Sequence, residues 1–248
     1  LFGAAWAFIP GFLQATRGSH VVITTIMFNF IAAGIIVALL TGALMRPGQS
    51  TPQTRDFAAD ATIPRIHEIG RALGFDMAST PLNLSIVLAL LACVGVWVLV
   101  WRTPFGYRLR TLGQSEPAAR YAGVSVPKTI VIAMCVSGAL AGLMAVNELL
   151  GAQEKLVLYF TAGYGFAGIA VALMGRSHPV GIVLASLLFG ALYQGGAELS
   201  FEFGSIDREM VLVIQGLIIL FSGALAYMLE APLSRVFGRR PAPAAASA

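Results

Sequence analysis

The chain has 248 residues, of which 57% are hydrophobic and 11% are charged, with a formal net charge of +4. Soluble domains contain about 25% charged residues on average, so this composition excludes an ordinary soluble domain. Uncharged runs of about 18 or more mostly apolar residues are typical of transmembrane helices. The sequence therefore predicts an all-α protein, a polytopic transmembrane helix bundle.

In chain order, the apolar runs predict about six to seven spans. Residues 1–13 are only part of a span, and the chain begins inside apolar sequence, which predicts a fragment that lacks upstream helices. Residues 156–175 are long enough to span, but the sequence TAGYGFAG within them predicts a short or broken helix. The other runs are long enough to cross a bilayer on their own: residues 21–45, 82–101, 129–147, 179–197 and 210–229.

The distribution of Lys and Arg between the loops predicts the orientation of the chain. If residues 102–128 are cytoplasmic and the spans alternate, the inner segments carry ten Lys/Arg and two acidic residues, whereas the outer segments carry six and ten. This asymmetry predicts a multi-pass protein of the cell (inner or plasma) membrane with a cytoplasmic C-terminus. A transmembrane domain then covers residues 1–229, and the Ala/Pro-rich residues 230–248 form a disordered cytoplasmic tail.

The longest external loop, residues 46–81, contains the segment TIPRIHEIGRAL. Its Ile and Leu residues recur near helical spacing, which predicts a short amphipathic helix. Two interpretations remain open for this helix. It lies at the outer membrane interface, or it is a docking surface for an external partner.

The chain lacks the motifs of membrane enzymes and of nucleotide-binding proteins. The segment IHEIGRA has one His where the H-E-x-x-H zinc motif needs two, and no G-x-x-x-x-G-K-[ST] sequence is present to hold phosphates. The spans carry essentially no ionisable residue, which argues against a proton-coupled pump. We therefore expect no enzymatic activity, no metal and no cofactor, and an energy source that another protein supplies.

Several spans carry uncharged polar side chains. Hydrogen bonding between helices accounts for most such groups, but neutral amides and hydroxyls also suit the path of a neutral, hydroxyl-rich solute. Asn29 has aromatic neighbours, and Gln194 follows Tyr193, an arrangement that suits sugar rings or nucleobases. The candidate residues of a substrate path are Thr25, Asn29, Phe30, Asn147, Gln194 and Gln215.

Small residues recur in the segment SGALAGLMA. It contains Gly138-x-x-x-Gly142, a spacing that lets two membrane helices approach closely. We expect this segment to form a tightly packed helix contact.

A polar segment, residues 102–128, interrupts the apolar runs with five Lys/Arg and one Glu. Ser115 is a favourable N-cap, Pro117 is tolerated in a first helical turn, and Gly123 is a natural stop. These signals predict a helix of about two turns over residues 115–123. So short a helix is unstable alone in water, so it rests either on the cytoplasmic leaflet or on a cytoplasmic protein.

The same region resembles a known family. The run TPFGYRLRTLGQSEPAARYAGVSVPKTIVIAMCVSGALAGLMA is similar to the cytoplasmic loop and following helix of bacterial ABC importer permeases, in the branch that handles simple sugars, nucleosides and branched-chain amino acids. The family loop typically reads G-x-x-x-R-A-x-G-x-N-x-x-A-A-x-x-x-G-I, followed by S-G-x-x-A-G. This chain departs at Thr111 and Ser115, where Ala and Asn are commoner.

Two further stretches narrow the resemblance to nucleoside and simple-sugar permeases. HVVITTIMFNFIAAG resembles their V-I-T-T-I-M-L-N-x-I-A run. GYGFAGIAVALMGRSHPVG resembles their G-F-D-G-I-A-V-A-L-L-G-x-x-x-P-x-G stretch, with Ala167 where Asp is frequent. The resemblance implies the transmembrane permease subunit of an ABC importer for nucleosides or simple sugars, driven by separate ATPase subunits. Two alternatives remain open: a permease for branched-chain amino acids, and a self-sufficient carrier or channel whose polar segment is only a membrane-surface helix.

The resemblance also implies partners. These are two cytoplasmic ATP-binding subunits, a second permease subunit in a homodimer or heterodimer, an external substrate-binding lipoprotein and membrane lipid, with no nucleic acid. The helix at residues 115–123 corresponds to the coupling helix that enters a cleft of the ATPase, with Ala118 and Ala119 fitting the groove. The residues implied in coupling are Ser115, Glu116, Pro117, Ala118, Ala119, Arg120 and Gly123.

Overall fold

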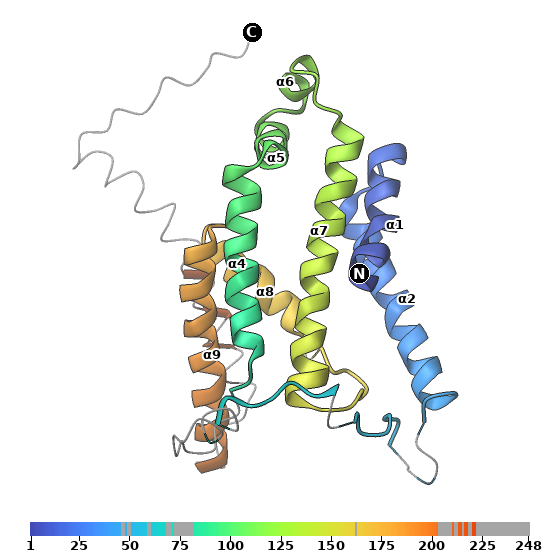
Figure 1. Cartoon of the computed structure of the whole chain (residues 1–248), viewed down its shortest axis with the longest axis vertical. Helices are drawn as coiled ribbons and strands as arrows, with labels where there is room; N and C mark the ends of the chain where they lie inside the picture. Colours follow the sequence, from blue (N-terminus) through green and yellow to red (C-terminus); the bar gives the residue numbers. More distant parts are fainter. Residues whose placement is uncertain are drawn as a thin grey trace, which may run out of the picture. The chain divides into compact units, whose positions relative to one another are not determined.

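A computed structural model of the chain describes residues 1–45, 48, 51–58, 61–67, 71, 82–161, 163–202, 210, 213, 214, 216, 217, 220 and 221. The chain divides into two compact units, Leu1–Ala162 and Gly163–Ala248. Among the described residues, β-pairing is limited to two isolated bridges. The helices of the first unit are α1 (Phe2–Arg17), α2 (Val21–Thr41), α4 (Ser85–Arg102), α5 (Pro104–Gln114), α6 (Glu116–Tyr121), α7 (Val126–Val146) and the π-helix η2 (Asn147–Ala152), and those of the second are α8 (Tyr164–Met174) and α9 (Pro179–Glu202) (Figure 1).

Four helical segments are long and apolar enough to cross a membrane: Val21–Thr41, Ser85–Arg102, Val126–Ala152 and Pro179–Glu198. They confirm the expected all-α, multi-pass architecture. The predicted total of six to seven spans is not reached within the described residues, because α1 has 16 residues and α8 has 11. The predicted span at residues 210–229 lies largely outside the described part of the chain, as does the predicted tail.

The apolar run at residues 156–175 is interrupted as its sequence predicts. Residues 158–161 form turns, and α8 begins only at Tyr164. Within the second unit, Gly175 and Gly181 allow the backbones on either side of the α8–α9 turn to touch, because a Cβ atom on Gly181 would overlap the carbonyl oxygen of Gly175. Tyr164 and Tyr193 also meet edge to face, with 6.3 Å between ring centroids.

The most extensive contact between described helices joins α1 to α7, two elements far apart in sequence. Glycine makes it possible. A Cβ atom on Gly138 would overlap both the carbonyl oxygen of Gly3 and the Cβ atom of Ala7. One turn further along α1, a Cβ atom on Gly11 would lie 2.8 Å from the Cβ atom of Met134. The small residues on both helices therefore confirm the close packing expected from SGALAGLMA and identify α1 as the partner.

This contact predicts different tolerance at two glycines of one helix. Gly138→Ala should destabilise the protein by roughly 1–3 kcal/mol, because the added methyl group has no room. Gly142→Ala is the matched control, since the nearest atom to its new Cβ would be 3.9 Å away, an ordinary contact distance. Thermal unfolding of the two variants in detergent measures the difference. Equal Tm values for Gly138→Ala and Gly142→Ala would contradict the packing.

Candidate functional site

The polar segment that interrupts the apolar runs folds into two helices, α5 and α6. Thr103 is the N-cap of α5, because its hydroxyl accepts a hydrogen bond from the Gly106 N–H at 3.2 Å, and Pro104 occupies the first turn. A Cβ atom on Gly106 would overlap the carbonyl oxygens of Leu99 and Val100, so α5 turns back directly against the end of α4. The sequence Thr-Pro is a local signal for this helix that the prediction of a single short helix overlooked.

Helix α6 has the two caps that its sequence predicts. The Ser115 hydroxyl accepts a hydrogen bond from the Ala118 N–H at 3.4 Å, and Pro117 lies in the first turn. At the other end, Gly123 adopts a φ of +74° and its N–H bonds to the Arg120 carbonyl at 3.0 Å. The Val124 N–H bonds to the Ala119 carbonyl at 2.9 Å, which completes a Schellman motif.

One side of α6 packs inside the chain. Ala119 has 0% exposure, and Val124 and Val126 in the following turn are also buried. Helix α6 contacts both α5 and α7. Ala119 therefore anchors α6 to its own chain and does not belong to the surface available to a partner, in contrast to Ala118, which is exposed. The groove-filling role expected for Ala118 and Ala119 stays a prediction, with Ala118 at the surface of this chain and Ala119 buried in it.

The opposite side of α6 is open. Arg120 and Glu116 form an ion pair along the helix, with Nη2 2.6 Å from Oε1. Tyr121 is 94% exposed, a large side chain that the sequence-based set of residues omitted. An aromatic residue on a short polar helix outside the spans is the signal that identifies it. A shallow hollow of about 580 Å³ is lined by Glu116, Pro117, Arg120 and Tyr121.

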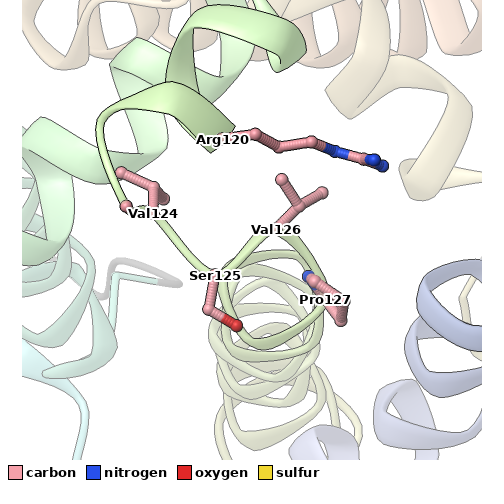
Figure 2. A pocket seen from close by; sticks show the side chains of 6 residues that line it. Arg120, Val124, Ser125, Val126 and Pro127 are labelled. Carbon is pink, nitrogen blue, oxygen red and sulfur yellow. The ribbon is translucent and has the colours of Figure 1, made fainter.

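A second hollow, of about 470 Å³, lies between α6 and the start of α7 (Figure 2). In Figure 2 the Arg120 side chain extends past Val126, and Ser125 and Pro127 lie at the first turn of α7. Arg120 thus borders both hollows. Together these residues give the α6 end of the first unit a polar, contoured surface with one projecting aromatic ring.

Three candidate substrate-path residues belong to α2, and they differ in exposure. Thr25 satisfies its hydroxyl within the helix, since its Oγ1 donates to the Val21 carbonyl at 2.9 Å. Asn29 is exposed, and Phe30 is 70% exposed. Phe28 instead packs edge to face against Trp6 of α1, with 5.7 Å between ring centroids. The amide and one aromatic ring are therefore presented away from the helix contact.

The remaining candidates fall in different places. Gln194 of α9, in the second unit, is exposed, and its Nε2 donates to Glu198 Oε1 at 3.0 Å. Gln215 lies outside the described residues. Asn147 opens η2, and its Oδ1 accepts a hydrogen bond from Asn83 Nδ2 at 3.2 Å.

Asn83, Ser85 and Asn147 form a cluster at the end of α7 opposite α6, which we call the polar latch. The Ser85 hydroxyl contacts the Oδ1 atoms of both Asn83 and Asn147. Asn83 is 7% exposed and lies directly against Gly151, where a Cβ atom would overlap its side chain. The structure thus brings Asn147 together with two residues that the predicted substrate path did not include.

A segment of the predicted external loop crosses this end of the first unit. Residues 51–58 and 61–67, which we call the strap, hydrogen-bond to residues 150–157 after α7 and to residues 82–84 before α4. Arg65 also pairs with Glu154, with 3.3 Å between Nη2 and Oε1. The prediction of a helix throughout TIPRIHEIGRAL is wrong for residues 62–65, because Pro64 and Arg65 pair with the chain before α4. Residues 68–70 and 72–81 lie outside the described part of the chain.

Comparison with known proteins assigns the family. Residues 1–223 match the family described as branched-chain amino acid transport system / permease component. The chain belongs to this family. It is 38% identical over 88% of its length to a guanosine ABC transporter permease of Bacillus subtilis, of which it covers 61%. It is 33% identical over 88% of its length to a glucose ABC transporter permease of Haloferax volcanii, of which it covers 57%.

A third relative is a nucleoside ABC transporter permease of Lactococcus lactis, 32% identical over 95% of this chain and 64% of its own length. The permease chain spans about three fifths of the length of these relatives. No solved structure matches it. The four long apolar helices and the family together make it a permease component that crosses the membrane several times.

The caps of α6 predict a contrast between two glycines. Gly123→Ala should weaken the end of α6 by roughly 1–2 kcal/mol, because the alanine must keep a left-handed conformation. Gly113→Ala, within α5, should be neutral or stabilising by roughly 0.5–1 kcal/mol. A Cβ atom meets nothing within 4 Å at either position. Hydrogen exchange of the amides of residues 119–124 measures the change, and unaltered protection in Gly123→Ala would refute the capping.

Proposed function

We propose that this chain is the membrane-spanning part of an ABC importer permease that carries nucleosides or simple sugars and is driven by separate cytoplasmic ATPase subunits. The proposal rests mainly on the structure of α6. It is a short polar helix with both ends capped, which lies beyond the ends of α4 and α7 (Figure 1). Its buried side is fixed by its own chain, and its open side is free for a partner.

The need for an external energy source supports a docking role for this surface. To move a solute against its gradient, a permease that has no phosphate-binding loop and no charged residue in the middle of its described spans needs work from outside. A partner protein can drive a conformational change only through a surface to which it binds. Helix α6 suits this purpose because it is packed against α5 and against α7, so a push on α6 is passed to both. In this proposal residues 102–128 and the C-terminus are cytoplasmic, and the chain has no enzymatic activity of its own.

Other partners follow from the same proposal. Helix α2 is mostly apolar, with Asn29 and three threonines as its polar residues, which suits a helix that contacts lipid or a second permease subunit on part of its surface. The strap lies at the end opposite α6 and is the proposed contact for an external substrate-binding lipoprotein. The proposed role of α6 is the same in a homodimer and in a heterodimer of permease subunits.

The substrate class is inferred from neutral chemistry. Asn29 offers an amide and Phe30 an aromatic face on α2, and Gln194 offers a second amide on α9. Amides hydrogen-bond to hydroxyl groups and base edges, and aromatic rings stack on sugars and nucleobases without a counter-charge. The three relatives are named as permeases for guanosine, for glucose and for nucleosides. Branched-chain amino acids, named in the family description, are the second candidate.

The docking proposal predicts that Tyr121 anchors the ATPase. Exposed aromatic residues at the centre of an interface cost about 2 kcal/mol or more when truncated, equivalent to about 30-fold in affinity. Tyr121→Ala in the complete permease should therefore weaken binding of the purified ATPase subunit by about 30-fold. Because Tyr121 is 94% exposed, the substitution leaves the fold intact.

Tyr159→Ala is the matched control. Tyr159 is 80% exposed and follows η2, at the other end of α7. Its loss should leave ATPase binding within about threefold of the wild type, less than the effect of a single hot spot. Equal affinities for Tyr121→Ala and the wild type would overturn the anchor, and absence of any ATPase binding by the wild type would overturn the proposed function.

A further inference from the structure

Helix α7 connects the two ends of the first unit. Together with η2 it runs from Val126 to Ala152, 27 residues in one helical segment. At 1.5 Å per residue, this corresponds to about 40 Å. Its first turn follows α6, and its middle is held against α1 by the glycine contact at Gly138. Because α1 supports the middle of α7, a displacement of one end of α7 is passed to the other end.

The far end of α7 differs from its middle in helical winding. Helix α7 changes at Asn147 from α-helical to π-helical winding, which continues to Ala152. Short π-helical turns are rare and frequently occur at functional sites. Here the change in winding begins at the residue that enters the polar latch, and it places Gly151 directly against Asn83.

The hydrogen bonds of the latch allow two arrangements. The Ser85 hydroxyl contacts the Oδ1 atoms of both Asn83 and Asn147, yet a hydroxyl has one proton and donates to one acceptor at a time. Asn83 Oδ1 also accepts the Ser85 backbone N–H at 3.1 Å, and Asn83 Nδ2 donates to Asn147. Neutral amides and a hydroxyl can exchange these bonds without separating charge.

The strap connects the latch to the surface. Ile63 N–H donates to the Leu150 carbonyl, within η2, at 2.9 Å. On the α4 side, Ile66 N–H donates to the Leu82 carbonyl at 2.9 Å, immediately before Asn83. The strap therefore bonds to the chain on both sides of the latch, and a change in the distance between α7 and the start of α4 must change the strap.

We propose that Asn83, Ser85 and Asn147 are positioning residues that transmit movement of α6, through α7, to the strap. This inference rests on the proposed function and deepens it by naming the route between the ATPase and the external binding protein. In one state the Ser85 hydroxyl bonds to Asn147 and holds the end of α7 against α4. In the other it bonds to Asn83 alone, so that only the hydrogen bond from Asn83 Nδ2 still joins Asn147 to the chain before α4, and the strap can shift.

The test uses the complete transporter, with its ATPase and binding protein, in proteoliposomes. Ser85→Ala and Asn83→Leu should leave basal ATP hydrolysis unchanged, while stimulation by the binding protein and substrate uptake fall by about 5- to 150-fold, the usual range of coupling between sites. Ser137→Ala is the matched control, because Ser137 is an exposed hydroxyl of α7 outside the latch, and it should retain both activities.

Failure of the latch and failure of the proposed function give different results. Stimulated hydrolysis and uptake at wild-type levels in both latch variants would overturn the latch and leave the proposed function standing. A wild-type complex without ATP hydrolysis would instead overturn the proposed function.

If the variants fail to accumulate in the membrane, the pair Asn83→Cys and Asn147→Cys, with Cys93→Ala and Cys135→Ala, provides a second test. A short, reducible thiol cross-linker should abolish uptake and a reductant should restore it, whereas uptake that continues in the cross-linked protein would overturn the latch.

Discussion

The contact between α1 and α7 is the constraint on which the first unit depends. In a membrane the apolar effect does not drive helices together, so close packing must supply the attraction. Gly138 brings the backbone of α7 against Gly3, and the small Ala7 extends the same contact. Helix α7 is thereby held against α1, between α6 at one end and the polar latch at the other. The proposed transmission of force along the chain requires such a supported helix.

The uncharged middle portions of the spans bear on both the energy source and the class of solute. A permease with charged groups deep in the membrane could draw on a proton or ion gradient, whereas the charged residues of the four long helices described lie near the helix ends. The exposed side chains of these helices include two amides and an aromatic ring, at Asn29, Gln194 and Phe30. Such groups suit neutral, hydroxyl-rich solutes and provide no driving force. In the proposed function, the polar residues outside the spans, on α6 and around the strap, couple the permease to its partners. Family membership and the geometry of α6 agree in this respect.

Local features were predictable from the sequence, and contacts between distant segments were not. Ser115, Pro117 and Gly123 act within one or two turns, so their spacing alone predicted α6 and both of its caps. The Gly138-x-x-x-Gly142 spacing predicted a close contact, but only the fold identifies α1 as the partner. Burial of Ala119 and the pairing of Asn83 with Asn147 also depend on which helices meet. The amphipathic pattern at residues 62–65 misled because backbone pairing with the residues before α4 prevailed over local helix propensity.

The central claim is that work enters this permease from a separate ATPase. The most direct measurement is uptake of radiolabelled nucleoside, glucose and leucine by proteoliposomes that contain the complete permease, its binding protein and its ATPase subunit. The account predicts uptake of the nucleoside or the sugar that requires both ATP and the ATPase subunit. Uptake of the same solute at an equal rate without the ATPase subunit would identify a self-sufficient carrier and contradict the account.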